Sequence, residues 1–166
     1  MVTLSSINQD ADLERSAEVG RLSCAITEHQ LFAGLLWESF PRLVSAFRTK
    51  EFQDEEITCH CPDALHDGFL VLEGRVAITH RLRGLDHILD LAGFGTVFNL
   101  EGLAGIEESH GAARALGKVR LLVMDTQLLK REFDSHPQIG YPIIKNFAKL
   151  MIVQHDKVFE HWVMGT

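Results

Sequence analysis

The spacing of apolar residues predicts two helices near the start of the chain. Apolar positions between Leu13 and Ile26 indicate the first helix, which Gly20 weakens. The second carries apolar residues at helical spacing: Phe40, Leu43, Val44 and Phe47. Pro41 fits this helix only in its first turn, where a backbone N–H is not needed.

The pattern changes between Glu56 and Met124, where short apolar segments alternate with turn residues. The predicted strands cover residues 57–59, 69–72, 76–80, 88–91, 97–98, 113–116 and 119–124. The turns between them include Glu73-Gly74, Gly93-Phe94-Gly95 and Leu116-Gly117-Lys118. Strands at this even spacing predict an antiparallel sandwich or barrel, and no helix-length segment interrupts them to suggest a parallel sheet.

Helical signals return after Met124. Asp125 or Thr126 can cap a short helix that runs to Phe133. The run Ser135-His136-Pro137-Gln138 resembles a capping box and predicts the start of a long helix ending near Val163. Its apolar stripe consists of Ile143, Ile144, Phe147, Leu150, Met151, Val158, Phe159, Trp162 and Val163. A stripe this rich must pack on the sheet, on a second copy or on a partner.

Four motifs occur in a fixed order within this pattern. They are LFAGL at residues 31–35, DGFLVLEGRV at 67–76, GFGTVF at 93–98, and a strand, short helix and His-Pro over 119–137. In this order they resemble the family of cyclic-nucleotide-binding domains, over residues 31 to about 155. They correspond to its LF..L start, its Y-hydrophobic-(I/V)-L-x-G-x-V hairpin with a positive-φ glycine turn, its G-x-x-F segment, and the opening of its last helix.

The resemblance implies an α+β, mainly β fold. An antiparallel double-stranded β-roll (jelly roll) would be flanked by N-terminal helices and a long C-terminal helix. It divides the chain into an N-terminal helical segment (1–30), a cyclic-nucleotide-binding-like β-roll (31–134) and a C-terminal helix of the dimerisation type (135–166).

The family's phosphate-binding cassette reads F-G-E-(L/I)-A-L, a short loop, then R-(T/S/A)-A. Its glutamate receives the ribose 2′-hydroxyl, and its arginine pairs with the phosphate. With Phe98 and Ala115 aligned, Asn99 takes the glycine position, Leu100 the glutamate position and Ser109 the arginine position. Both charged contacts are therefore missing.

The residues around this gap do not replace the lost charges. Glu101 is one residue away, and a one-residue slip along a strand moves a side chain to the other face. Glu107 and Glu108 would repel an anion. The cassette-equivalent site is predicted to consist of Phe98, Asn99, Leu100, Glu101, Gly102, Ser109, His110 and Gly111. Leu100, Gly102 and Ala112 favour a neutral or apolar ligand, or none, and no cofactor is expected.

Composition limits the remaining functions. The net charge of −7 disfavours attraction to nucleic acid, and the bases Arg81, Arg83, Arg114, Lys118 and Arg120 are interpreted as solvated strand faces. No apolar run approaches the ~20 residues that span a bilayer. The N-terminus lacks the features of a signal peptide, and three scattered cysteines argue against a disulfide framework. We therefore expect a cytoplasmic protein that binds neither membrane nor nucleic acid.

The sequence motifs give little support to a metal site, a haem site or an enzyme active site. Cys59, His60, Cys61 and His66 suggest a metal or haem site, but no second ligand pair completes a tetrahedral set. A cupin enzyme would need a His-x-His pair, which is absent, and the chain has no phosphate-binding glycine loop or hydrolase nucleophile motif. We expect no catalytic residues and no resident metal.

The resemblance is strongest to catabolite-activator-like transcription factors. In them a winged helix-turn-helix follows the long helix and enters the DNA major groove, whereas this sequence stops at Thr166. We therefore expect a stand-alone regulatory or sensor module that acts through protein contacts or a different small ligand. The alternative is the sensor domain of a transcription regulator without its DNA-binding domain. A homodimer is expected, and the candidate contacts are Phe147, Leu150, Met151, Val158 and Trp162.

Overall fold

The computed structural model describes residues 26–60, 66–83, 85–106 and 111–164. The first predicted helix lies outside them, apart from its last residue, Ile26. In chain order the elements are η1 (Gln30–Phe32), η2 (Trp37–Ser39), α2 (Phe40–Leu43), η3 (Val44–Ala46), β1 (Phe47–Phe52), β2 (Ile57–His60), β3 (Asp67–Leu82), β4 (Leu85–Ala92), β5 (Val97–Phe98), η4 (Glu101–Ala104), β6 (Gly111–Asp125), α3 (Thr126–Ser135) and α4 (Pro137–Met164). Strands thus lie between helical ends, as predicted.

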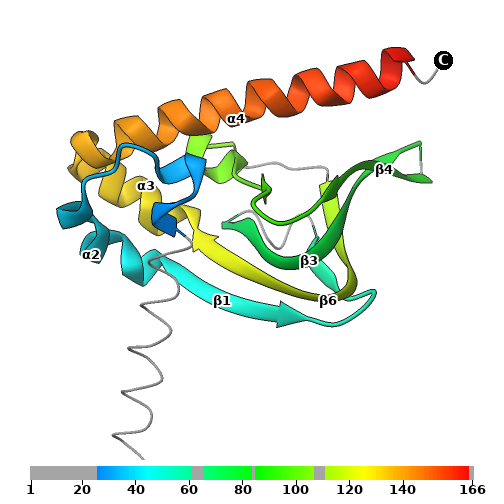
Figure 1. Cartoon of the computed structure of the whole chain (residues 1–166), viewed down its shortest axis with the longest axis horizontal. Coiled ribbons are helices and arrows are strands. Elements are labelled where there is room, and N and C mark those ends of the chain that lie inside the picture. Colours follow the sequence, from blue (N-terminus) through cyan, green and yellow to red (C-terminus); the bar gives the residue numbers. More distant parts are fainter. Residues whose placement is uncertain (1–25, 61–65, 84, 107–110, 165–166) are drawn as a thin grey trace, which may run out of the picture.

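The strands form one rolled antiparallel sheet (Figure 1). Its order is β1-β6-β3-β4, while β2 also pairs with β6 and β5 with β3. The long strands β3 and β6 form the centre, with a ladder from Asp67 opposite Asp125 to His80 opposite Gly111. This confirms the predicted β-roll flanked by helical segments.

Two predicted turns are instead irregularities within continuous strands. Gly74 has φ of +85° and Gly117 has φ of +79°, so both take the left-handed conformation expected of turn glycines. The chain nevertheless resumes the same ladder beyond them, with register shifts beside Glu73. A Cβ on Gly74 would come 2.6 Å from the Lys118 backbone oxygen. The two glycines therefore bend paired strands at a bulge, and four predicted strands merge into β3 and β6.

The second predicted helix is much shorter than expected. Pro41 stands in the first turn of α2, as predicted, but this helix ends at Leu43 and a 3₁₀ turn follows. Phe47 begins strand β1, which the sequence analysis did not predict, and pairs with Met124. Phe47 and Phe52 are buried at the two ends of β1. Pairing with β6 therefore decides the conformation of a segment whose local apolar spacing is compatible with a helix.

The two C-terminal helices follow the prediction closely. The Asp125 carboxylate caps α3 by accepting hydrogen bonds from the backbone N–H groups of Gln127 and Leu128, at 3.0 and 2.9 Å. Helix α4 is 28 residues long and begins at Pro137. Ser135 does not cap it, because Ser135 is the last residue of α3. Instead, the His136 carbonyl accepts from the N–H of Ile139 at 2.9 Å.

Buried side chains form two clusters on opposite faces of the sheet. The cluster inside the roll includes Phe52, Phe69, Phe98, Val119 and Leu121. The second lies between the sheet and the helical segments, and it includes residues of η1, α2, η4, α3 and the first half of α4. The helical segments that the structure describes thus lie on one side of the roll (Figure 1).

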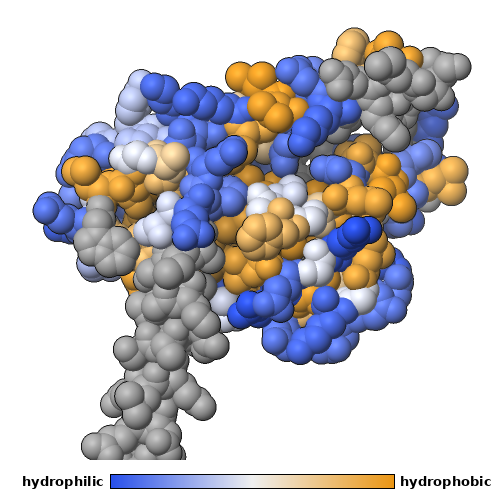
Figure 2. Space-filling model, in the orientation of Figure 1, coloured by the Kyte–Doolittle hydropathy of each residue, from blue (hydrophilic) through white to orange (hydrophobic). Residues whose placement is uncertain are grey.

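The second half of α4 leaves apolar side chains exposed. Ile152, Val153 and Phe159 are more than half exposed, and so are Leu85, Ile88 and Leu91 on β4. Apolar surface is visible at this end of the molecule in Figure 2. Within the described residues, no helix has the length and apolar character needed to cross a membrane.

Candidate functional site

The cassette-equivalent segment begins at β5, which is held against β3. Phe98 pairs with Phe69 in the antiparallel ladder. Their rings stack at a centroid distance of 5.1 Å and an interplanar angle of 19°. Phe98 is therefore part of the apolar filling of the roll, and it fixes the point where the segment leaves the sheet.

Asn99 takes the backbone conformation that glycine would take at this position. Its φ is +56°, in the left-handed region, which asparagine tolerates better than most residues. The side-chain Nδ2 donates a hydrogen bond to the Asp67 carbonyl at 2.7 Å. The chain path after β5 is thus compatible with asparagine, although the family pattern has glycine here.

Leu100 lies in the core on the helical side of the sheet. It is 2% exposed and belongs to the cluster that contains Leu103 and Leu129. Its side chain also fills the space beside Gly68, where an added Cβ would collide with it. Leu100 is therefore a packing residue, and its predicted role as part of a ligand-binding surface stays a prediction.

Glu101 begins η4 and has an unusual environment for a carboxylate. Its Oε2 is buried and has no hydrogen-bond partner among the described residues. Gly102, the next residue, is half-buried. The short helix ends at Ala104, and Gly105, with φ of +75°, is its C-cap. The acid nearest the expected glutamate position is therefore displaced from it by one residue.

The other half of the predicted site is only partly described. Gly111 begins β6 and pairs with His80, toward the opposite end of β3 from Phe69. Ser109 and His110 lie outside the described residues, as do Glu107 and Glu108. The structure therefore places Phe98 through Gly102 together, and it does not show how the second half of the cassette approaches them.

Most bases on the strands are already paired with carboxylates. Arg114 contacts Glu55 at 2.8 Å and Lys118 contacts Glu51 at 2.9 Å. The remaining pairs are Arg120 with Glu73, Arg81 with Asp86 at 3.8 Å, and Arg48 with Asp67 at 2.6 Å. The bases on β3 and β6 lie on strand faces, as interpreted from the sequence, but Arg83 does not: it lies in the turn after β3, with φ of +53°. The charges of the strand bases are thus largely balanced within the sheet itself.

The ionisation of Arg114 is influenced by a neighbouring carboxylate. A hydrogen bond from Arg114 to the Glu55 carboxylate, followed by the attraction between their charges, raises the pKa of Arg114 above its ordinary value. The guanidinium is solvent-exposed, so the pair is screened by water. Arg114 therefore stays charged and already has an acidic partner.

The suggested metal ligands do not gather in the described part of the chain. No three His, Cys, Asp or Glu side chains lie close enough there to hold a metal ion. Cys61 lies outside the described residues. His66 Nε2 lies 3.2 Å from the Gln127 amide nitrogen, and its carbonyl accepts from Thr126. His66 is thus engaged in linking the start of β3 to α3.

Two amide side chains on α4 make contacts that the sequence analysis did not predict. Asn146 Nδ2 donates to the carbonyls of Leu31 and Ala33, at 3.2 and 2.7 Å. Gln154 Nε2 donates to the Val97 carbonyl at 3.1 Å, directly before Phe98. Helix α4 is therefore tied both to the N-terminal turn and to the strand that leads into the cassette. The sequence signal that could have indicated these two contacts is a polar residue beside the apolar stripe of a helix.

The five candidate dimer contacts divide between different environments. Phe147 and Leu150 are partly buried against the protein's own helical-side core. Met151 is half-buried. The side chains of Val158 and Trp162 lie outside what the structure describes. Part of the predicted stripe therefore serves packing within the chain.

The rolled sheet, the short helix after β5 and the long last helix together define the fold of a cyclic-nucleotide-binding domain. No protein-family model matches the sequence. The comparison with curated proteins gives no significant match.

Solved structures provide the evidence for this fold. A Geobacter metallireducens protein assigned to cyclic-nucleotide binding is 18% identical, with a TM-score of 0.67 over 76% of this chain and 92% of its own. The N-terminal domain of a Streptomyces coelicolor transcriptional regulator is 19% identical, with a TM-score of 0.64 over 80% and 95%. The regulatory subunit of a cAMP-independent protein kinase A from Trypanosoma brucei is 16% identical, with a TM-score of 0.68 over 89% and 51%.

Proposed function

We propose that this chain is a regulatory or sensor module that does not bind cyclic AMP or cyclic GMP at micromolar concentration. The observation that carries the proposal is the position of Leu100. At the place where the family pattern has a glutamate, this chain has a leucine that is buried in the core. This position therefore has no carboxylate that could accept a hydrogen bond from the ribose hydroxyl of a cyclic nucleotide. The leucine side chain fills the space instead.

The missing arginine strengthens the proposal. Ser109 stands at its position, and the strand bases Arg114 and Arg120 are paired with Glu55 and Glu73. Removing one partner of a buried charge pair costs about 2–5 kcal/mol. That corresponds to a loss of affinity of roughly 30-fold to several thousand-fold. Loss of the glutamate contact adds to this.

Proteins with this fold include a regulatory subunit that belongs to a protein kinase A described as cAMP-independent. That subunit comes from Trypanosoma brucei and overlaps 89% of this chain. Its description supports a regulatory role for this fold in a system that does not depend on cyclic AMP. We extend that role to this chain on the basis of its cassette residues.

Isothermal titration of the full chain with cyclic AMP and cyclic GMP tests the proposal. We expect no binding heat at micromolar concentrations of either nucleotide. A domain of the same fold that retains the glutamate and the arginine serves as the control for the titration. Saturable binding of either nucleotide to this chain in the micromolar range would refute the proposal.

We propose further that the module forms a homodimer through the second half of α4. Ile152, Val153 and Phe159 are exposed there, which is costly for apolar side chains unless a partner covers them. Two-fold pairing of identical helices would cover the same patch on both subunits. Light scattering at tens of micromolar should give the mass of a dimer, and a monomer mass would contradict this part of the proposal.

A second candidate function is the sensor domain of a transcription regulator. The overlap with 95% of the Streptomyces coelicolor regulator's N-terminal domain favours it. The test is the coding sequence that continues this chain in its gene. A following segment of about 70 residues with helix-turn-helix spacing would support the regulator, and a stop codon after Thr166 would contradict it.

A further inference from the structure

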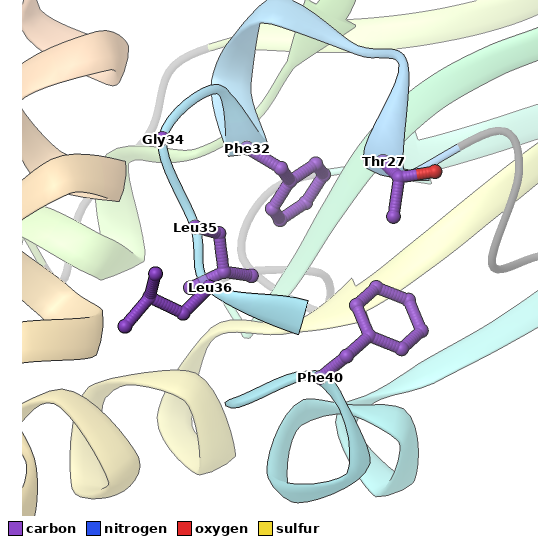
Figure 3. A pocket seen from close by; sticks show the side chains of 6 residues that line it. All are labelled: Thr27, Phe32, Gly34, Leu35, Leu36 and Phe40. Atoms are coloured by element: carbon purple, nitrogen blue, oxygen red, sulfur yellow. The ribbon is translucent and has the colours of Figure 1, made fainter. Parts of the chain in front are cut away.

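Apolar side chains are exposed at two places among the helical segments. One is an open hollow at the N-terminal turn, where Phe32 and Phe40 form part of the lining (Figure 3). Leu36 in its wall is 68% exposed, so the hollow is continuous with solvent and does not enclose a ligand. The other place is helix α4, where exposed side chains follow one another along most of the helix. This second surface has a regular pattern that points to one kind of partner.

The exposed side chains of α4 form a single row, which we call the outer stripe. Neighbouring members are three or four residues apart and therefore lie on one face of the helix. The members are Tyr141, Ile144, Ala148, Ile152, His155, Phe159 and Val163. The opposite face packs on the helical-side core through Ile139, Ile143 and Leu150. At a rise of about 1.5 Å per residue, the outer stripe extends over roughly 33 Å.

The outer stripe suits a second copy of the same helix. Two long helices pack side by side when each carries apolar residues at spacings of three and four. A two-fold axis brings identical faces together, so one stripe supplies both halves of the contact. This step rests on the homodimer proposed above, and it adds His155 to the face that the second subunit would cover.

Histidine is the only residue type in the outer stripe whose charge ordinarily changes between about pH 5 and 8. The side chain of His155 is 80% exposed, and its Nδ1 lies 3.7 Å from the Asp156 carboxylate. Its ring stacks on Phe159, with centroids 6.5 Å apart and an interplanar angle of 11°. Strand β5 contacts this half of the helix through Gln154 and consists of two apolar residues. In the single chain, water, a carboxylate and an aromatic face therefore all tolerate a positive charge on this imidazole.

Pairing of the outer stripes would remove this tolerance. Two-fold symmetry places two copies of His155 in one interface, together with Ile152 and Phe159. A positive charge that moves from water into apolar surroundings loses hydration, and two such charges in one interface also repel each other. Neutral imidazoles carry neither penalty. Dimer formation therefore favours the state in which both histidines have released their protons.

We infer that His155 makes the proposed homodimer sensitive to pH, so that the subunits associate when this histidine is neutral and separate when it is protonated. The sign is opposite to the effect of the overall charge. The formal net charge is −7 at pH 7 with the histidines neutral, so proton uptake reduces the repulsion between two copies and would strengthen their association. A dimer that weakens on acidification therefore indicates a local effect at the interface.

Analytical ultracentrifugation of the full chain near pH 8 and near pH 6 tests the inference. The dimer dissociation constant of the wild type should be at least about fivefold higher near pH 6, because each of two histidines must release a proton on association. His155→Gln keeps a polar side chain without the charge, and its dissociation constant should agree within about twofold at the two pH values. His87→Gln is the matched control, since His87 is also exposed but lies on β4, and it should keep the response of the wild type. Circular dichroism at both pH values checks that each variant is folded.

The results separate this inference from the proposed dimer. A wild-type chain that is monomeric at both pH values at tens of micromolar would refute the homodimer and the inference with it. A wild-type dimer that is equally tight at both pH values would overturn the inference alone, and so would a His155→Gln dimer that keeps the wild-type response. His155→Lys carries its charge at both pH values and gives a second measurement if His155→Gln does not fold. It should associate at least about fivefold more weakly than the wild type near pH 8, and equal association would also contradict the inference.

Discussion

Leu100 and Gly68 fit together across the start of β3, where the leucine side chain fills the space beside the glycine. A Cβ added to Gly68 would meet Leu100 Cδ2, and also approach the Asn99 carbonyl and the Thr126 methyl group at 3.4 Å. Because Leu100 is buried in the helical-side core, it has little room to move away. The glycine thus allows the segment after β5 to pack closely on β3.

Substituting Gly68 by alanine should therefore destabilise the protein. We expect a loss of about 1–3 kcal/mol in the free energy of unfolding, as for other overpacked cores. Gly93→Ala is the control, since a Cβ there has no neighbour within 4 Å. It should change stability by less than about 0.5 kcal/mol. Urea unfolding followed by circular dichroism measures both, and equal effects would show that the Leu100 contact does not constrain Gly68.

The order of elements could be predicted because the apolar period changes from helix-like to strand-like and back. The exceptions arise where tertiary pairing decides. Phe47 fits a helical pattern, yet its segment lies against β6 and becomes β1. Gly74 has the positive φ expected of a turn, yet the ladder continues past it. Local spacing does not carry the information on which strand will pair with such a segment.

The candidate site could be predicted only as a set of positions. The resemblance identified Asn99 and Leu100 as positions at which this sequence differs from the cassette pattern. The direction of the Leu100 side chain could not be predicted, because the link between β5 and η4 has no regular period. Contacts between segments that are distant in the sequence, such as those of Asn146 with the N-terminal turn, could not be predicted either.

Restoring the family's acid at position 100 should harm the protein rather than repair its cassette. Leu100→Glu would place a carboxylate among buried apolar side chains, which costs several kcal/mol or forces the acid to take up a proton. We expect a loss of at least about 3 kcal/mol and no gain of cyclic AMP binding. Leu100→Met, with similar volume, should cost less than about 1.5 kcal/mol.

Unfolding curves and calorimetry separate the possible results for position 100. A Leu100→Glu variant that is as stable as Leu100→Met would show that this side chain can reach solvent. A variant that also binds cyclic AMP in the micromolar range would show that the glutamate alone is the missing element. Either result would contradict the packing role assigned to Leu100.

Asn146→Ala should loosen the attachment of α4 to the N-terminal turn. The substitution removes the donor for the Leu31 and Ala33 carbonyls, of which the first belongs to a buried residue. We expect a loss of about 1–2 kcal/mol, together with faster hydrogen exchange in residues 30–35. Lys149→Ala, an exposed change on the same helix, is the control and should have little effect. Exchange rates in residues 30–35 that match the wild type would rule out a clamping role for Asn146.

A charge on the exposed half of α4 should dissociate the proposed dimer. In a two-fold interface, Ile152→Glu places two carboxylates near one another and removes apolar contact area. We expect the dimer dissociation constant to rise at least about tenfold, or about 1.4 kcal/mol. Ile106→Glu is a matched control because Ile106 is also exposed, at 50% compared with 62% for Ile152, but lies beyond η4. Analytical ultracentrifugation over a concentration series should show weaker association for Ile152→Glu than for Ile106→Glu. Equal association of the two variants would show that the dimer interface does not include this half of the helix.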